Sequence, residues 1–172
     1  ASAPSLRKLE LLLRTLAFDY YQVQAKRVKR NRKHVAKQSL ALLARHSFKV
    51  AHFCEFRRQT DKMLKHYAAA YSIVLELLNS RDAQRTLGIE QIRGVADTLN
   101  YKLCSHLMAA LQTKEAVAQF QTHTRAFLAA GYQNALNDSG GECRHWHWFA
   151  RQYMVFAQLL EQLHLRGGAA VS

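Results

Sequence analysis

A run of cations is the stretch of this sequence most able to do chemistry. It holds seven Lys and Arg side chains in twelve residues and no acid, namely Lys26, Arg27, Lys29, Arg30, Arg32, Lys33 and Lys37. Such a run can neutralise nucleic-acid phosphates, lie on an anionic membrane leaflet or face an acidic protein. The nearby Tyr20 and Tyr21 are not interleaved with the cations as base-stacking platforms, so nucleic acid is disfavoured. We predict an interaction patch for an acidic partner or an anionic lipid.

The nine histidines and three cysteines raise the question of a metal site, which their spacing does not support. The densest cluster is Cys143, His145 and His147, whose positions at i, i+2 and i+4 point in three directions on one helix. A closed zinc site needs four ligands in closely spaced pairs. We therefore predict no metal and no cofactor, and we interpret His123 as a hydrogen-bonded core histidine.

The acidic residues do not form a catalytic constellation either. Only twelve occur, and they are scattered along the chain. Nucleophilic catalysis needs a positioned Ser or Cys with a base and an orienting acid, and the sequence has no Gly-rich phosphate loop or nucleophile elbow. Glu55 and Asp97 are interpreted as outer-face or capping residues. We predict no catalytic residue, and hence a protein that is not an enzyme.

The composition is that of one helical domain. The 172 residues are 49% hydrophobic, carry a formal charge of +13 and include one proline, and no Val/Ile/Thr-rich alternation indicates strands. An odd number of cysteines on helix faces is typical of buried free thiols in a reducing compartment. No apolar run reaches the roughly 18 residues of a spanning helix. We expect a soluble piece, excised from a longer subunit because it opens with Ala1.

Apolar periodicity predicts about six helices. The first is capped by Ser5 and carries the stripe Leu9, Leu12/Leu13, Leu16, Tyr20 and Val23. The next two span about 34–57 and 60–79, and residues 80–87 are expected to be a loop. A fourth helix opens at Gly88 and a fifth at Thr113, with Gly131 as a candidate interruption. The last helix spans about 142–164, and residues 166–172 are expected to be a disordered tail.

Small and aromatic residues recur at fixed offsets in two helical hairpins. Val50 and Ala51 are followed by Met63 and Tyr67, and the same spacing begins again at Leu103. Tetratricopeptide-type repeats use this offset, although their period is about 34 residues. The sequence predicts a right-handed α-solenoid of antiparallel helical hairpins forming a single domain over residues 1–172. Its repeat-packing core is predicted to be Val50, Ala51, Phe53, Met63, Tyr67, Ala70, Leu103, Cys104, Ala116 and Phe120.

Several segments have little reason to recur through helical periodicity alone. They include Tyr20-Tyr21, residues 45–56 (RHSFKVAHFCEF), residues 100–104 (NYKLC) and residues 151–153 (RQY). Taken in order over about residues 5–165, they resemble the foie gras domain family of the trafficking protein particle (TRAPP) complex. Within that pattern, Asn100, Tyr101 and His123 are expected to be packing and hydrogen-bonding positions between helices.

The resemblance implies a scaffold role in a vesicle-tethering complex. The assembled complex of that family activates a Rab-family GTPase in transport from the endoplasmic reticulum to the Golgi apparatus and in autophagy. The resemblance further implies docking to a small core adaptor subunit, and a cytoplasmic location, peripheral at Golgi and endoplasmic reticulum exit membranes. From the residues alone, a basic helical RNA-binding module or another protein-interaction module is the alternative.

Overall fold

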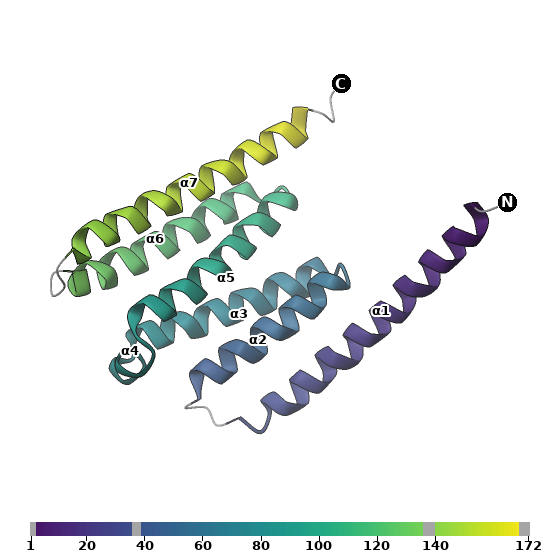
Figure 1. Ribbon diagram of the computed structural model, residues 1–172, viewed down its shortest axis with the longest axis horizontal. Coiled ribbons are helices and arrows are strands. Elements are labelled where there is room, and N and C mark those ends of the chain that lie inside the picture. Colours follow the sequence, from purple (N-terminus) through teal and green to yellow (C-terminus); the bar gives the residue numbers. More distant parts are fainter. Residues whose placement is uncertain (1–2, 36–38, 136–139, 169–172) are drawn as a thin grey trace. The chain divides into compact units, whose positions relative to one another are not determined.

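The protein is all-helical, as the sequence predicts. The computed structural model describes residues 3–35, 39–135 and 140–168, and within these ranges it contains seven helices and no strand. The helices are α1 (Ala3–Arg32), α2 (Leu40–Phe56), α3 (Thr60–Asn79), α4 (Arg81–Leu87), α5 (Ile89–Ala109), α6 (Thr113–Ala135) and α7 (Gly141–Gly168) (Figure 1). The chain forms two compact units, residues 1–70 and residues 71–172. The single domain expected over residues 1–172 stays a prediction.

The first helix begins earlier than its expected cap. Helix α1 starts at Ala3, so Ser5 lies inside its first turn instead of capping it. The reason is that Pro4 is compatible with the first turn of a helix, where its missing N–H has no intrahelical partner. Towards its C-terminal end α1 packs on α2 through Tyr21, whose ring stacks on that of Phe56 at 4.6 Å between centroids.

The core of the unit formed by residues 1–70 is built on small residues around one aromatic ring. Val50 and Ala51 of α2 are almost fully buried, as are Met63 and Tyr67 of α3. The Tyr67 ring meets the Phe48 ring of α2 edge-on at 5.6 Å. Small side chains let helix backbones approach closely, and the ring fills the space between them.

A short helix replaces the loop expected at residues 80–87. Ser80 caps α4, because its hydroxyl accepts a hydrogen bond from the Ala83 N–H at 3.3 Å. Asp82 lies in the first turn, where a carboxylate is favoured by the helix dipole, and it pairs with Arg85. None of the residues of α4 is buried. The helix therefore leaves no apolar period in the sequence, which is why periodicity missed it.

In the unit formed by residues 71–172, helices α5, α6 and α7 pack together, and the unit also contains α4 and the part of α3 from Tyr71 onwards. Helix α6 contacts both α5 and α7, and α5 also contacts α7. Their shared core contains Cys104 and Met108 of α5, Ala116 and Phe120 of α6, and Leu159 of α7. The Phe120 ring stacks on the Phe156 ring at 4.2 Å between centroids.

Two glycine positions differ from the expected helix boundaries. Gly131 does not interrupt α6, which continues to Ala135. A Cβ atom at this position would lie 2.6 Å from Nδ1 of His145 on α7, so glycine permits the close approach of the two helices. Helix α7 continues to Gly168, beyond the expected end at about residue 164. Residues 166–168 are therefore helical, and the remainder of the expected tail, 169–172, lies outside the described residues.

The predicted repeat-packing core is placed inside the two units. Nine of its ten members are at most 5% exposed, and Phe53 is half-buried. Tyr67, Ala51, Ala70 and Ala116 have no measurable exposure. Two of the three cysteines, Cys54 and Cys104, are buried free thiols, and the third, Cys143, is exposed.

Candidate protein-interaction surfaces

The basic run lies at the C-terminal end of α1. Lys26, Arg27, Lys29 and Arg30 are exposed on its last two turns, and Lys33 is exposed in the turn that follows. The side of this segment that packs against the rest of its unit carries buried Ala25 and half-buried Val28 and Arg32. Cations are favourable at the negative end of a helix dipole. Lys37 lies outside the described residues.

The structure adds cations that the sequence run does not contain. Burial lowers the pKa of His46, and Lys49, Arg32 and Arg45 lower it further. The pKa of His66 is likewise lowered by burial and then by Lys29, Arg32 and Lys65. Arg32 of α1 thus lies near cations of both α2 and α3. We call the combined surface the basic patch: Lys26, Arg27, Lys29, Arg30, Arg32, Lys33, Arg45, Lys49 and Lys65.

Nearly all of the net charge belongs to the unit that carries this patch. Residues 1–70 contain sixteen Lys and Arg against four Asp and Glu, a balance of +12. Residues 71–172 contain nine against eight, a balance of +1. The charge that dominates the composition is therefore a property of one unit, and the other unit is almost neutral.

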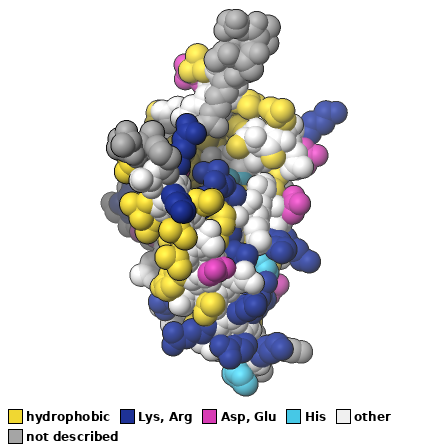
Figure 2. Space-filling view, turned by 90° about the vertical axis from the view of Figure 1, so that its right-hand side faces the viewer, with side chains coloured by type: hydrophobic (Ala, Val, Ile, Leu, Met, Phe, Trp, Pro, Cys, Tyr) yellow, Lys and Arg dark blue, Asp and Glu magenta, His cyan; other side chains and the backbone are white. Residues whose placement is uncertain are grey.

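Large apolar side chains also remain on the surface of the same unit. The stripe that predicts α1 is exposed, from 52% at Leu9 to 66% at Leu16, and so are Tyr20 and Val23. The face of α1 towards α2 is a different one, which includes Tyr21 and Ala25. Hydrophobic side chains are plainly visible on the face drawn in Figure 2, beside Lys and Arg side chains. Neighbouring exposed apolar side chains are typical of surfaces that take part in interactions.

A buried polar network joins α3, α5, α6 and α7 within the unit of residues 71–172. Asp97 of α5 accepts hydrogen bonds from the Trp148 indole N–H at 3.0 Å and faces Nε2 of His123 at 2.9 Å. On its other side, Nδ1 of His123 lies 3.1 Å from the Tyr71 hydroxyl. Burial raises the pKa of Tyr71, so this hydroxyl stays protonated. The prediction of a hydrogen-bonded core histidine at position 123 is confirmed.

The acids considered for catalysis form hydrogen bonds between neighbouring helices. Asp97 holds α6 and α7 as described, and Glu55 of α2 accepts a hydrogen bond from the Tyr67 hydroxyl at 2.6 Å. Their interpretation as outer-face or capping residues is therefore wrong, because each one pairs with a donor on a neighbouring helix. Sequence spacing could not show this, since the pairing residues are 12 to 51 positions apart.

The positions implied by the family resemblance divide into buried and exposed ones. Asn100 is buried and accepts a hydrogen bond from the Gln119 amide at 3.2 Å. Next to it, burial raises the pKa of the Cys104 thiol to about 12, so the thiol is unreactive as a nucleophile. Tyr101 is 46% exposed, so it is not a buried packing position.

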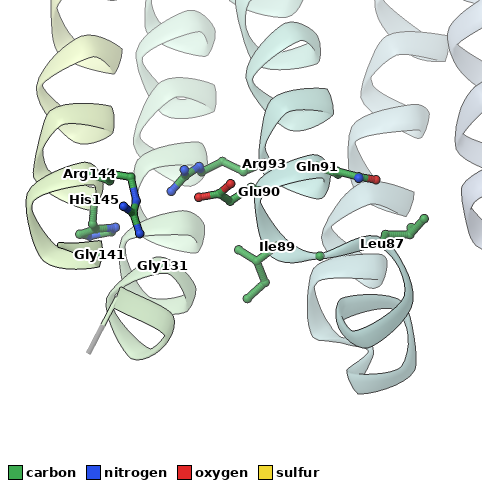
Figure 3. A pocket seen from close by; sticks show the side chains of 10 residues that line it. Leu87, Ile89, Glu90, Gln91, Arg93, Gly131, Gly141, Arg144 and His145 are labelled. Atoms are coloured by element: carbon green, nitrogen blue, oxygen red, sulfur yellow. The ribbon is translucent and has the colours of Figure 1, made fainter. Parts of the chain in front are cut away.

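Three hollows follow α5 and α7 in the unit of residues 71–172. The first has a volume of about 370 Å³ and lies by the first turns of both helices. Figure 3 shows Glu90 and Arg93 reaching from α5 towards Arg144 of α7 beside it. The second, of about 530 Å³, shares these three residues and adds Gly94 among others. The third, of about 490 Å³, shares Gly94 with the second and ends at Leu159.

No group of three or more His, Cys, Asp or Glu side chains among the described residues could hold a metal ion. Within the same residues, no helix has the length and apolar character that crossing a membrane requires.

Comparison with known proteins shows what the chain is similar to. Residues 89–171 match the model of the family described as Foie gras liver health family 1. Trafficking protein particle complex subunit 11 of Homo sapiens is 29% identical to the chain over 153 residues, and the Bos taurus and Gallus gallus proteins of that name show the same identity. The alignment covers 88% of this chain and 13% of each relative. The resemblance of the chain to the foie gras domain of trafficking protein particle complex subunit 11 is therefore confirmed.

Proposed function

We propose that this chain is a non-catalytic scaffold segment of a multisubunit, TRAPP-like vesicle-tethering complex. The observation that carries the proposal is the alignment with trafficking protein particle complex subunit 11 over 88% of the chain. The chain spans 13% of those relatives, so it would supply one structural module of a much larger subunit. The activity of the assembled complex, activation of a Rab-family GTPase in endoplasmic reticulum to Golgi transport and in autophagy, would lie in other subunits.

The helical architecture supports this role. We propose that the hairpins continue into a right-handed, tetratricopeptide-like α-solenoid in the full-length subunit, because such folds bury their apolar faces by stacking one hairpin on the next. The exposed stripe of α1 would be buried if a further helix of the full-length subunit packed against it. In a solenoid the working parts are the extended faces, which suits a subunit that joins other subunits.

The basic patch is the surface we assign to an acidic counterpart. Its cations come from three helices of one unit, so they present a broad field instead of a single binding pocket. An acidic face of a neighbouring subunit, such as a small core adaptor, or an anionic membrane leaflet at Golgi or endoplasmic reticulum exit membranes would both be attracted. Such contacts weaken as salt screens the charges.

Affinity purification from cytosol tests the proposal. The tagged chain is incubated with nuclease-treated and untreated cytosol at moderate salt, and the retained proteins are identified by mass spectrometry. We expect subunits of the TRAPP complex to be retained in both samples. A triple charge reversal, Arg27→Glu, Lys29→Glu and Arg30→Glu, is expected to reduce their recovery. The matched control is a triple reversal at exposed positions of the other unit, Arg81→Glu, Lys114→Glu and Arg125→Glu.

The alternative function is recognisable in the same experiment. If the retained proteins were ribonucleoproteins that nuclease removes, the basic patch would be a nucleic-acid site and the scaffold proposal would be wrong. That outcome also predicts binding to single-stranded RNA with a steep loss of affinity between 50 and 200 mM salt, roughly in proportion to the phosphates contacted.

A further inference from the structure

Exposed apolar residues of α1 follow a regular heptad spacing. Six of them alternate at intervals of three and four residues, which is the spacing of the a and d positions in a coiled coil. None of the six is less than 52% exposed. From the first to the last they span roughly 26 Å, at about 1.5 Å per residue. We call this row the α1 seam: Leu6, Leu9, Leu13, Leu16, Tyr20 and Val23.

The α1 seam is separate from the face of α1 that packs on α2. The packed face includes buried Ala25 and half-buried Tyr21, whose ring stacks on those of Phe53 and Phe56 of α2. Helix α1 is therefore apolar on two sides, and its contact with α2 uses only one of them.

Helix α7 shows what fills a row of this kind. Its own row has the same intervals of three and four residues, and it lies partly against α6. Phe156 and Leu163 of that row pack on the core that contains Phe120 of α6, and the Phe120 ring also meets the Tyr153 ring edge-on at 5.0 Å. A second helix is therefore the shape that fits such a row. The row of α7 is Trp146, Phe149, Tyr153, Phe156, Leu160 and Leu163.

The α1 seam is complementary to itself when a second copy of α1 runs antiparallel. In one register all six residues of the seam take part, each a position faces a d position, and every facing pair is apolar. Each pair then occurs twice, as a two-fold symmetric interface requires. The facing pairs are Leu13 with Leu16, Leu9 with Tyr20, and Leu6 with Val23.

The acids beside the α1 seam do not oppose this pairing. In the same register, Glu10 of one copy lies nearest Ala17 of the other. Asp19 likewise lies nearest Leu12. Two charges of the same sign therefore do not meet beside the seam, where they would otherwise disfavour the pair.

The cations at the end of α1 select the antiparallel orientation. In a parallel pair the heptad spacing continues into Arg27 and Arg30, each of which would face its own counterpart. In the antiparallel register the two Arg27 residues are separated by 25 positions, because facing positions add up to 29. That separation is roughly 37 Å along the helices, against a screening length of about 8 Å at physiological ionic strength. The positive charge of the unit therefore permits the antiparallel pair and opposes the parallel one.

We propose that α1 pairs along the α1 seam with α1 of a second copy of this chain, as an antiparallel two-stranded coiled coil. The seam covers about two and a half heptads, which is short for a coiled coil, so the dimer is in reversible equilibrium with the monomer. The assignment goes beyond the proposed function, which needs only one copy of the chain.

Sedimentation equilibrium of the 172-residue chain over a wide range of concentrations tests the proposal. We expect the mass to rise with concentration from the 19.7 kDa of the single chain towards twice that value. Leu13→Glu places a carboxylate in the central pair of the seam, against apolar Leu16 of the second copy. It is expected to raise the Kd of the dimer at least about tenfold, because burying an unpaired charge is unfavourable.

Leu11→Glu is the matched control, since it makes the same change on the same helix outside the seam. Leu11 is 64% exposed, about as exposed as Leu13 at 58%. The control is expected to leave the Kd within about twofold. Leu and Glu have similar helix propensities, so circular dichroism should show the same helix content in both variants.

A mixture of two variants tests the orientation. Only the antiparallel register brings the new carboxylate of Leu13→Glu opposite the new ammonium group of Leu16→Lys. We expect this mixture to associate more tightly than a mixture of Leu13→Glu with Leu13→Lys, in which the opposite charges would face each other only in a parallel pair.

Three results would overturn the assignment. They are a mass of 19.7 kDa at every concentration, equal effects of Leu13→Glu and Leu11→Glu, and tighter association of Leu13→Glu with Leu13→Lys than with Leu16→Lys. A chain that stays monomeric would leave the seam to a further helix of the full-length subunit. The proposed function is judged separately, by retention of TRAPP subunits from cytosol, so either conclusion can fail while the other stands.

Discussion

The hydroxyl of Tyr67 illustrates how one atom contributes to the unit of residues 1–70. It donates to the Glu55 carboxylate at 2.6 Å from a ring that is fully buried. Burial, this hydrogen bond and the nearby carboxylate raise the pKa of Tyr67, so the hydroxyl remains a donor throughout the physiological range. Hydrogen bonds to charged groups are worth about 1.5–3 kcal/mol.

Tyr67→Phe is expected to lower the free energy of unfolding by about 1.5–2 kcal/mol, the lower part of that range, because Glu55 remains partly exposed to water. Chemical denaturation monitored by circular dichroism measures the change. Tyr20→Phe is the matched control, since Tyr20 is 59% exposed and should tolerate the substitution. Equal stability of the two variants would show that the hydroxyl contributes nothing to the fold.

Phe120 is the residue on which the core of residues 71–172 depends. Its ring is 5% exposed, stacks on Phe156 and meets Tyr153 edge-on at 5.0 Å. Phe120→Ala is expected to cost about 3–5 kcal/mol, the usual range for a buried phenylalanine, and to lower the Tm markedly. Tyr101→Ala, at an exposed position, is the control and should change the stability by about 0.5 kcal/mol or less. An unchanged Tm for Phe120→Ala would contradict the packing described.

At the scale of helices, Asp97 is the residue whose hydrogen bonds connect α5 to α6 and α7. Asp97→Ala would leave the His123 ring nitrogen and the Trp148 indole N–H without this acceptor. We expect a loss of about 2–4 kcal/mol, since each buried donor left unsatisfied costs about 1–3 kcal/mol. Val95→Ala, at a position of the same helix that is 51% exposed, should be nearly neutral. A double-mutant cycle with Trp148→Phe should show coupling between the two side chains.

Helix α4 is stabilised by its N-terminal cap and not by the packing of buried side chains. Ser80→Ala removes the hydrogen bond to the Ala83 N–H, a change that costs about 0.5–2 kcal/mol at helix caps. Because none of the residues of α4 is buried, we expect faster amide exchange in residues 81–87 and little change in the global Tm. Ser72→Ala, exposed within α3, is the control. Global destabilisation by Ser80→Ala would mean that α4 supports the core.

Sequence periodicity predicted the helices whose apolar residues are buried. It was least informative where the apolar pattern of the sequence and the burial of the residues disagree. It missed α4, none of whose residues is buried, and it detected the α1 stripe without indicating that this stripe is exposed. The roles of Asp97 and Tyr101 were out of its reach, because they depend on which helices are neighbours. The basic run was visible as a sequence, but the contributions of Arg45 and Lys65 require the fold.

For the molecule as a whole, stability should depend on pH through three histidines. The pKa values of His46, His66 and His145 are lowered from 6.5 in the folded state, first by burial and then by neighbouring cations. The unfolded state therefore binds more protons as the pH falls below about 6.5, and the free energy of unfolding decreases. We expect the Tm to fall between pH 7.5 and pH 5. His66→Gln should reduce this dependence, and a Tm that rises on acidification would contradict the burial of these rings.

The two units carry unequal charges, and this difference affects the association rate of a partner more than its dissociation rate. A balance of +12 on residues 1–70 against +1 on residues 71–172 means that long-range attraction of an acidic partner acts on the first unit. Such attraction raises association rate constants and fades with ionic strength. Short-range contacts set the dissociation rate instead, which salt changes less. Substitutions in the basic patch are thus expected to act mainly on the on-rate.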